Sequence, residues 1–502
     1  MMKKLIILPL IIILFGLTGC VGSTQLTTTT TGLPENGSIE QGDAMIFPKS
    51  EYGYIGDPMP FYHDGVMNMF YLLDERRGSI GFHPFALFQT SDFLNYDDIG
   101  TVIPYDNSIS SQDLALGTGS VIYGNDGLYH AYYTGHNGSG EMPYYEKIQH
   151  AVSSDMITWT KLPDDGFFGG VNDFRDPYVY YSEEDNEYWM LITTRDSLGG
   201  VLKIYKSTDL YFWQNHGTFY RNTEGSYNME CPTLIHYNGY YYLSFSEQGS
   251  GNDRIVHYRY TESIEDGFQI PAQDFFDGWG FYAGRIEKVE DRLVLSGWVA
   301  TKTLDKDYGT YMWGGNLVNH ELVQDESGLL YPKMMTETDE FLSNEVAYQI
   351  VDTNATPIEN GFTFSSNRGY NYLLFEELEE KPTKISFIVD ILDSSNFGIT
   401  LNAYESEVGS LNFYFDFENN RIEFYNVDAN LIAYSSPEIS IPFDFGNVDE
   451  LNITMVTEGS VIIVYVNDQI AMTSRAYDMA NSNFGFFTLS SNAVISNIHF
   501  FE

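Results

Sequence analysis

Cysteine and basic side chains are both scarce in this chain. Only two of its 502 residues are Cys, so no disulfide framework supports the fold. The 25 Lys and Arg residues stand against 70 Asp and Glu residues, which gives a formal net charge of −45 at pH 7. Such a charge repels phosphate backbones and anionic lipid headgroups. We therefore expect neither a nucleic-acid partner nor a polybasic membrane contact.

Apolar runs long enough to cross a bilayer are also missing. The basic start at residues 1–4 precedes an apolar run over residues 5–17, which is short for a membrane span and typical of a signal peptide. The run ends in Leu17-Thr18-Gly19-Cys20, which resembles the lipobox of bacterial lipoproteins. That resemblance implies a signal peptide over residues 1–20 and a lipid on Cys20. The simpler alternative is an ordinary secretory signal with an incidental Cys.

Residues 21–43 are rich in Thr, Ser and Gly and lack the apolar side chains that a core needs. We expect a flexible tether there, followed by a folded part outside the cytoplasm and lipid-anchored to the membrane surface. The rest is far too apolar for a disordered chain, since 43% of all residues are hydrophobic and 16% are aromatic. The 39 Tyr, 35 Phe and 45 Gly residues indicate many aromatic strands joined by tight turns.

A short turn followed by an alternating aromatic strand recurs five times. Asp-Gly and Asn-Gly favour the turns that match the twist of paired strands, so each copy predicts a β-hairpin. The turns are His63-Asp64-Gly65, Asn125-Asp126-Gly127, Glu184-Asp185-Asn186, Asn238-Gly239 and Glu290-Asp291.

A second pattern repeats at a similar interval of roughly 50 to 60 residues. It consists of a hydroxyl residue, Asp, three residues and an aromatic residue, and it occurs at Ser91-Asp92 to Tyr96, Ser154-Asp155 to Trp159 and Thr208-Asp209 to Trp213. Two markers with one period predict four-stranded repeats, and five copies predict a five-bladed β-propeller over residues 44–335. An array of β-sandwiches with coincidental turns is the alternative.

The pattern of polar and apolar residues changes after this region. Residues 334–340 are polar and acidic, which is typical of a linker. From residue 346 to residue 502, short apolar segments alternate with turn signals and show no helical periodicity. This part is predicted to be a C-terminal β-sandwich, so the whole chain is expected to be all-β.

Three carboxylates begin successive propeller strands, and each is followed closely by Pro. They are Asp57, Asp176 and Glu230, and their spacing fits two repeats and then one. Any one of them alone reads as a solvated acid in a turn. Equivalent positions of the blades converge on the propeller axis, so the three are expected to face one another. Glycoside cleavage needs such a set, because one carboxyl protonates the leaving oxygen while another supports the cationic centre.

Two motifs around these acids carry a resemblance to glycoside hydrolase family 32. They are Phe174-Arg175-Asp176-Pro177 and Met229-Glu230-Cys231-Pro232, with weaker agreement at residues 117–120, 151–155, 281–283 and 313–315. The resemblance implies that the chain cleaves β-fructofuranosidic bonds, as in sucrose, levan or inulin, with retention through a covalent fructosyl-enzyme.

The resemblance also assigns roles. Asp57 is the expected nucleophile and Glu230 the expected general acid and base, while Asp176 with Arg175 is expected to grip sugar hydroxyls. Cys231 is expected to be a buried neighbour of the acid and not a nucleophile. The further candidates for contact with the sugar are Ser120, Tyr54, Trp279, Tyr282 and Trp313, and ordinary core packing is the alternative for each aromatic among them.

The chain departs from the family around Asp57. Gly56-Asp57-Pro58-Met59-Pro60 replaces Trp-Met-Asn-Asp-Pro-Asn-Gly, and Gly280 and Arg285 stand where Asp and Gln are usual. An unusual fructoside or another furanoside is therefore a plausible substrate.

Two other functions fit the same sequence. One is an inverting furanosidase or xylosidase of the family 43 type, and the other is a non-catalytic glycan-binding lipoprotein. No cofactor or metal is expected, because no His, Cys or acidic cluster has ligand spacing. The sequence leaves the oligomeric state open.

Overall fold

The computed structural model describes residues 45–76, 83–171, 173–223, 225, 227–249, 254–365, 367, 369–391, 394–403 and 409–502. The predicted signal peptide, Cys20 and the predicted tether lie outside these residues. The regular secondary structure of the described chain is almost entirely β-strand, as the sequence predicts. No helix in the described ranges is both long and apolar enough to cross a membrane.

The first nineteen strands form antiparallel sheets in which consecutive strands pair. Their bounds are β1 (Tyr54–His63), β2 (Val66–Asp74), β3 (Phe85–Thr90), β4 (Asp97–Ile103), β5 (Ala115–Tyr123), β6 (Tyr129–His136), β7 (Glu146–Ser153), β8 (Trp159–Lys161), β9 (Phe174–Ser182), β10 (Glu187–Asp196), β11 (Gly199–Ser207), β12 (Gln214–Arg221), β13 (Met229–Tyr237), β14 (Tyr240–Glu247), β15 (Val256–Thr261), β16 (Phe281–Val289), β17 (Arg292–Lys302), β18 (Tyr311–Gln324) and β19 (Leu330–Lys333).

These strands divide into four sheets. Strands β5 to β8, β9 to β12 and β13 to β15 each form one sheet in sequence order. The fourth sheet joins β1–β4 to β16–β19, because β1 also pairs with β18 through Ile55 and Gly315. The first and last groups of strands in this region therefore meet.

All five predicted hairpins are present. Each turn lies between two paired strands: β1 and β2, β5 and β6, β9 and β10, β13 and β14, and β16 and β17. Asp64 and Gly65 have φ of 51° and 80°, and Asn238 and Gly239 have 45° and 87°. The Asp-Gly and Asn-Gly pairs are thus used where the backbone requires positive φ.

The second repeated pattern forms a tight turn between the third and fourth strands of three groups. The Asp carboxylate accepts hydrogen bonds from the amides two and three residues ahead, as Asp155 does from Ile157 and Thr158. The hydroxyl that completes the turn lies two residues before the Asp, at Thr90, Ser153 and Ser207. The pattern read from the sequence has its hydroxyl residue directly before the Asp, so the position of the hydroxyl that bonds in the turn is corrected by one residue.

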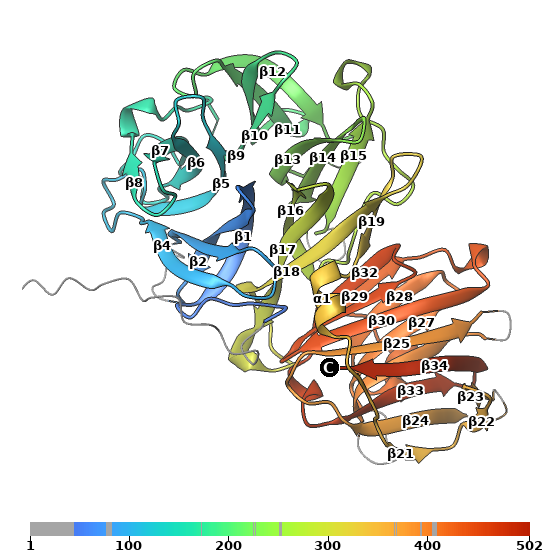
Figure 1. Cartoon of the computed structure of the whole chain (residues 1–502). Coiled ribbons are helices and arrows are strands. Elements are labelled where there is room, and N and C mark those ends of the chain that lie inside the picture. Colours follow the sequence, from blue (N-terminus) through green and yellow to red (C-terminus); the bar gives the residue numbers. More distant parts are fainter. Residues whose placement is uncertain are drawn as a thin grey trace, which may run out of the picture. The chain divides into compact units, whose positions relative to one another are not determined.

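The first strand of each group lies innermost (Figure 1). In that inner set β1 packs against β5, β5 against β9, β9 against β13, β13 against β16, and β16 against β1. Residues near the beginnings of these five strands are therefore brought together from positions far apart in the sequence.

The remaining strands form two larger sheets around an aromatic and aliphatic core. One sheet has the order β22-β23-β34-β25-β30-β31-β32, with β20 on β34, and the other has the order β21-β24-β33-β26-β27-β28-β29. The bounds are β20 (Glu345–Val346), β21 (Ile350–Thr353), β22 (Thr356–Ile358), β23 (Gly361–Phe364), β24 (Tyr370–Glu377), β25 (Thr383–Asp390), β26 (Phe397–Ala403), β27 (Leu411–Asp416), β28 (Arg421–Asn426), β29 (Ile439–Pro442), β30 (Glu450–Glu458), β31 (Val461–Val466), β32 (Ile470–Arg475), β33 (Asn483–Leu489) and β34 (Ala493–Phe501).

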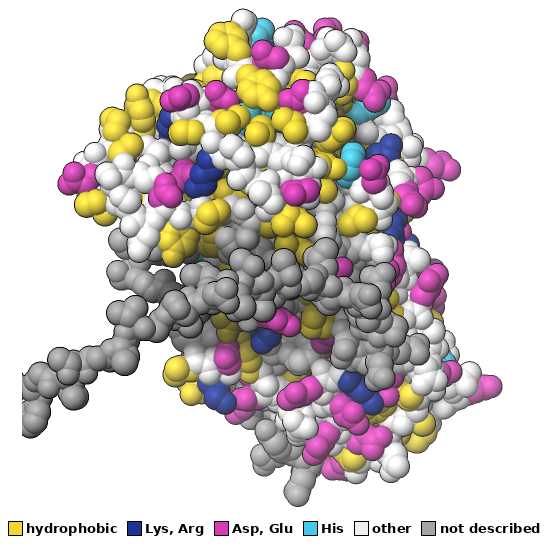
Figure 2. All heavy atoms as spheres, turned by 60° about the vertical axis from the view of Figure 1, so that its left-hand side comes forward, with side chains coloured by type: hydrophobic (Ala, Val, Ile, Leu, Met, Phe, Trp, Pro, Cys, Tyr) yellow, Lys and Arg dark blue, Asp and Glu magenta, His cyan; other side chains and the backbone are white. Residues whose placement is uncertain are grey.

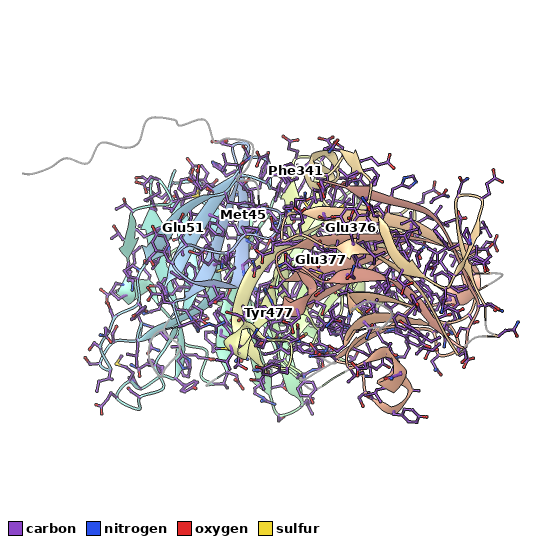
Figure 3. The ribbon with its side chains drawn as sticks, turned by 90° about the horizontal axis from the view of Figure 1, so that it is seen from below. Met45, Glu51, Phe341, Glu376, Glu377 and Tyr477 are labelled. Carbon is purple, nitrogen blue, oxygen red and sulfur yellow. The ribbon has the colours of Figure 1, made fainter. Side chains whose placement is uncertain are left out.

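The predicted linker is largely a short helix, α1 (Thr336–Phe341), in which Thr338 is buried. Polar contacts join the C-terminal sheets to the earlier strands. Tyr477, labelled in Figure 3, donates its amide to Oδ1 of Asp307 at 2.9 Å and accepts from the amide of Lys302 at 3.0 Å through its hydroxyl.

The surface carries the acidic excess of the sequence. On the face in Figure 2, Asp and Glu side chains are spread over the molecule and Lys and Arg are few. The acids that concern function lie instead on the inner strands, where Asp176 is buried and Asp57 and Glu230 are half-buried.

Candidate active site

A β-bulge interrupts each of the five inner strands near its beginning. In β1, β9, β13 and β16 two residues of the inner strand lie opposite one residue of the neighbour. The first bulge residue has positive φ in all four: 43° at Asp57, 55° at Asp176, 53° at Cys231 and 53° at Ala283. Since a bulge leaves a residue without a ladder hydrogen bond, the second position accepts Pro in three of the four strands.

This register corrects the predicted equivalence of the three carboxylates. Asp57 and Asp176 occupy the same bulge position, but Cys231 is the residue that matches them in β13. Glu230 lies one residue earlier, at the position of Arg175 and Tyr282. The site therefore has two adjacent layers, one containing two Asp and the other containing Glu, Arg and Tyr.

The three carboxylates nevertheless line one cavity. Its volume is about 470 Å³, and Arg175, Tyr282 and Trp313 also line it. In the described ranges no group of three or more His, Cys, Asp and Glu side chains has the arrangement of a metal site. The cavity is thus an acidic pocket with aromatic and cationic walls.

Asp57 is oriented by an indole. Trp298, which is 1% exposed, donates from Nε1 to Oδ1 of Asp57 at 3.1 Å. Burial and the neighbouring Glu230 raise the pKa of Asp57 to about 6. The carboxyl is therefore poised to lose its proton in the weakly acidic range.

Asp176 is buried more deeply and bonds to the backbone. Its Oδ2 accepts the amide hydrogen of Cys231 at 3.1 Å, and its own amide donates to Oγ1 of Thr134 at 3.0 Å. Burial raises the pKa of Asp176 to about 7, although Arg175 opposes this shift. The contact of Cys231 with the carboxylates is thus through its backbone, and burial raises the pKa of its thiol well above the ordinary value.

Both oxygens of Glu230 are held. Nη2 of Arg175 donates to Oε1 at 2.9 Å, and the hydroxyl of Tyr282 donates to Oε2 at 2.7 Å. Arg175 also bonds to Oδ1 of Asp173 at 3.0 Å and to Oε1 of Gln248 at 3.3 Å. These donors fix the direction in which the Glu230 carboxyl points.

An aromatic wall stands beside Asp57. The rings of Trp313 and His83 are stacked with centroids 4.2 Å apart, and Trp313 lies 5.6 Å from Trp298. A Cβ on Gly56 would lie 2.1 Å from a ring carbon of Trp313. The glycine that precedes Asp57 therefore makes room for the indole.

The family model for the N-terminal domain of glycosyl hydrolases family 32 matches residues 48–326, which is more than half of the chain. The chain belongs to glycoside hydrolase family 32. It is accordingly a glycoside hydrolase of the β-fructofuranosidase type, with a fructoside as its class of substrate.

The chain is similar to known hydrolases of this family at low sequence identity. The chain is 24% identical over 395 residues to sucrose-6-phosphate hydrolase of Streptococcus mutans. The alignment covers 73% of this chain and 79% of that protein. Among solved structures, sucrose-6-phosphate hydrolase from Lactobacillus gasseri superposes with a TM-score of 0.69 at 17% identity, covering 90% and 91% of the two chains. A Bombyx mori β-fructofuranosidase gives a TM-score of 0.68 at 18% identity, covering 92% and 93%. These structural likenesses show the family 32 fold.

Three residues predicted to contact the sugar do not line this cavity. The Ser120 hydroxyl accepts the amide hydrogen of Val179 at 3.0 Å, so it joins β5 to β9. The ring of Tyr54 lies under the Arg76 guanidinium, 4.4 Å away. Trp279 donates its indole hydrogen to the backbone oxygen of Glu438 at 2.8 Å and packs against the core of the C-terminal sheets.

The family 32 cavity also has members that the analysis of the sequence did not single out. Arg254 lies over the Tyr282 ring, with its guanidinium carbon 3.4 Å from the centroid. Glu146 lines the wall near Arg175, at 3.6 Å from Nη1. Neither belongs to a motif, and Arg254 comes from a loop before β15 that carries no repeat signal.

Proposed function

We propose that this family 32 protein hydrolyses β-fructofuranosidic bonds with retention, through a covalent fructosyl-enzyme. The observation that carries the proposal is the pair of held carboxylates in one cavity: Asp57 bonded to Trp298, and Glu230 bonded to Arg175 and Tyr282. Retaining glycosidases need one carboxylate as a nucleophile and a second as acid and then base.

In the first step an oxygen of Asp57 attacks the anomeric carbon of the fructosyl unit. The bond from that carbon to the leaving oxygen breaks, and the leaving oxygen takes the proton of the Glu230 carboxyl. The indole hydrogen on Oδ1 of Asp57 orients the carboxylate for this attack. The products of the step are the ester on Asp57 and the free leaving sugar.

In the second step Glu230 removes a proton from water, and the water oxygen attacks the same carbon. The ester bond breaks, the electron pair returns to Asp57, and Glu230 holds its proton again. Asp176 and Arg175 line the same cavity and supply an acceptor and a donor for sugar hydroxyls. This arrangement supports the proposed role of the pair in positioning the fructosyl ring.

We also propose how the chain is divided into domains and segments. We assign a five-bladed propeller to residues 44–335, supported by the five inner strands that pack in succession, and a sandwich domain to residues 346–502. We also propose residues 1–20 as a lipoprotein signal peptide, a lipid on Cys20, residues 21–43 as a tether and an extracytoplasmic location. The sequence at residues 1–43 supports these four assignments.

Product analysis tests the reaction. Purified protein is incubated with sucrose, sucrose-6-phosphate, levan and inulin, and proton NMR follows the anomer that appears first. Retention predicts β-fructofuranose before mutarotation, whereas an inverting enzyme releases the α anomer first. No fructose release from any of these substrates would reject the proposed substrate class.

Two variants test the roles. Asp57→Asn keeps the shape but removes the nucleophile, so we expect no measurable turnover. Glu230→Gln cannot donate a proton, so its loss of kcat/KM, which reports the first step and not the shared hydrolysis of the ester, is expected to be much larger on sucrose than on an aryl fructoside, whose phenolate leaves without protonation. An equal loss on both substrates would remove Glu230 from the acid role.

A further inference from the structure

A buried arginine without a carboxylate partner hydrogen-bonds to Thr118, which lines the proposed active-site cavity. Arg285 of β16 is 1% exposed. Its Nη1 donates to the backbone oxygen of Pro232 at 3.2 Å and its Nη2 to Oγ1 of Thr118 at 3.4 Å. Nε is buried and has no hydrogen-bond partner in the described part of the chain. Two long bonds to neutral acceptors are weak compensation for a desolvated charge.

Another buried arginine shows the usual arrangement. Arg259 is also 1% exposed, but it forms an ion pair with Asp274 and donates from Nε to the Tyr220 hydroxyl at 2.9 Å. No described carboxylate forms such an ion pair with Arg285. Its charge must therefore be balanced at longer range, or the site would carry an unpaired buried cation.

The residues around Arg285 indicate which negative charges balance its positive charge. Pro232 and Thr118 are bulge residues of β13 and β5, in the same layer as Asp57 and Asp176. The guanidinium charge lowers the pKa of both Asp side chains, against the larger effect of their burial. The cation and the two acids thus lie on three inner strands, β16, β1 and β9.

We propose that Arg285 is a positioning residue whose buried positive charge holds Asp57 and Asp176 in their carboxylate form. The proposal rests on the assignment of Asp57 as nucleophile above. Family 32 usually has Gln at this position, which offers hydrogen bonds without charge.

Other titratable or charged groups also surround the two acids and enter the interpretation of any pH profile. They are Arg175 of β9, Glu230 and Cys231 of β13, Tyr282 of β16, Arg254, Glu146 of β7, His136 of β6, His83 and, around Arg285 itself, Tyr178 of β9 and Glu287 of β16. All of them are retained in the variants below.

The test is the pH dependence of kcat/KM, measured on the best substrate of the panel for wild type, Arg285→Gln, Arg285→Met and Arg285→Lys. Without the positive charge, more alkaline conditions are needed to ionise Asp57. We therefore expect the acid limb of the pH profile in the Gln and Met variants to move to higher pH by roughly half a unit, because Arg254 lowers the pKa of Asp57 more than Arg285 does. The Lys variant keeps the charge, and its acid limb is expected to stay close to that of wild type.

Arg259→Gln is the matched control, because it removes an equally buried guanidinium that is not among the charges named as acting on Asp57 or Asp176. It is expected to lower Tm without moving the acid limb. The Met variant needs no buried hydrogen-bond partner, so it remains informative if the Gln variant does not fold.

Two results would overturn the inference: an unmoved acid limb in an active Gln or Met variant, or a Lys variant that shifts as far as they do. The second result would assign Arg285 to packing alone. Asp57→Asn separates this inference from the proposed function. If that variant remains active, the role of Asp57 fails; if it is inactive while Arg285→Gln keeps the wild-type profile, only the inference about Arg285 fails.

Discussion

Oδ1 of Asp57 accepts a hydrogen bond from the indole nitrogen of Trp298 across 3.1 Å. Trp298 in β17 is the strand partner of Tyr282 in β16, and the Tyr282 hydroxyl bonds to Glu230. One pair of neighbouring strands thus holds both the proposed nucleophile and the proposed acid. The relative placement of these two carboxylates depends on a single backbone register.

The indole bond predicts the effect of Trp298→Phe. The variant keeps an aromatic ring but removes a donor to a carboxylate, and such a bond contributes about 1.5–3 kcal/mol. We expect kcat to fall roughly 10- to 100-fold, with a smaller change in KM, because the bond orients the attacking group.

Steady-state kinetics measure this split between kcat and KM. Trp189→Phe is the control, since the Trp189 indole nitrogen is buried without a partner in the described chain and lies outside the cavity lining. A Trp298→Phe enzyme with unchanged kcat would show that Asp57 needs no orientation from the indole.

The raised pKa values of the two Asp side chains predict an unusually high acid limit of activity. Asp57 and Asp176 titrate near 6 and 7, and both are expected to act as carboxylates. The value of kcat/KM should therefore fall as pH drops below about 7 and fall more steeply below about 6. A profile that is flat from pH 5 to pH 8 would contradict this assignment of the ionised forms.

Much of the local structure was accessible from the sequence. Asp64-Gly65 and Asn238-Gly239 encode their turns by backbone preference alone, and Asp92, Asp155 and Asp209 cap turns within three residues. These interactions are short in sequence, so a local pattern reveals them. The repeat spacing also predicted that Asp57, Asp176 and Glu230 face one another, and the three line one cavity.

The features of the site that could not be predicted from the sequence depend on contacts between residues far apart in the chain. The one-residue offset of Glu230 follows from the β13–β14 register, and the bond between Trp298 and Asp57 joins residues 241 positions apart. Ser120 and Tyr54 lie near the inner strands as expected, but their side chains contact Val179 and Arg76. Alternation along a strand decides which face each side chain occupies, and the bulges change that alternation.

The close approach of Gly56 to the Trp313 ring predicts that position 56 does not tolerate a larger residue. In Gly56→Ala the new Cβ would overlap the Trp313 ring, so we expect a lower Tm and loss of activity. Trp313→Ala should restore much of the Tm in the double variant, because the two residues compete for one space.

Gly65→Ala is the control for a glycine substitution. Gly65 has φ of 80° and open space around its Cα, so its cost is conformational and Trp313→Ala should not relieve it. Additive changes of Tm in Gly56→Ala and Trp313→Ala would argue against direct contact between these two positions.

The Glu458 carboxyl, outside the active site, predicts that the free energy of unfolding depends on pH. Its carboxylate accepts the amide hydrogens of Ile46 and Phe47, at 3.3 and 2.8 Å, where the described chain begins. Burial raises its pKa to about 7 from an ordinary value of 4.5. The folded form therefore binds more protons than the unfolded form between pH 4.5 and pH 7, and the free energy of unfolding falls as pH rises through that window.

Glu458→Gln removes this titration while keeping an acceptor for the Phe47 amide. Relative to the variant, wild type is expected to lose about 3 kcal/mol of stability between pH 4.5 and pH 7.5. Chemical denaturation at several pH values measures the difference, and Glu379→Gln, at a side chain that is 67% exposed, serves as control. Parallel stability curves for wild type and Glu458→Gln would mean that this carboxyl titrates normally, and that the segment before β1 is held by the two amide bonds without a charge cost.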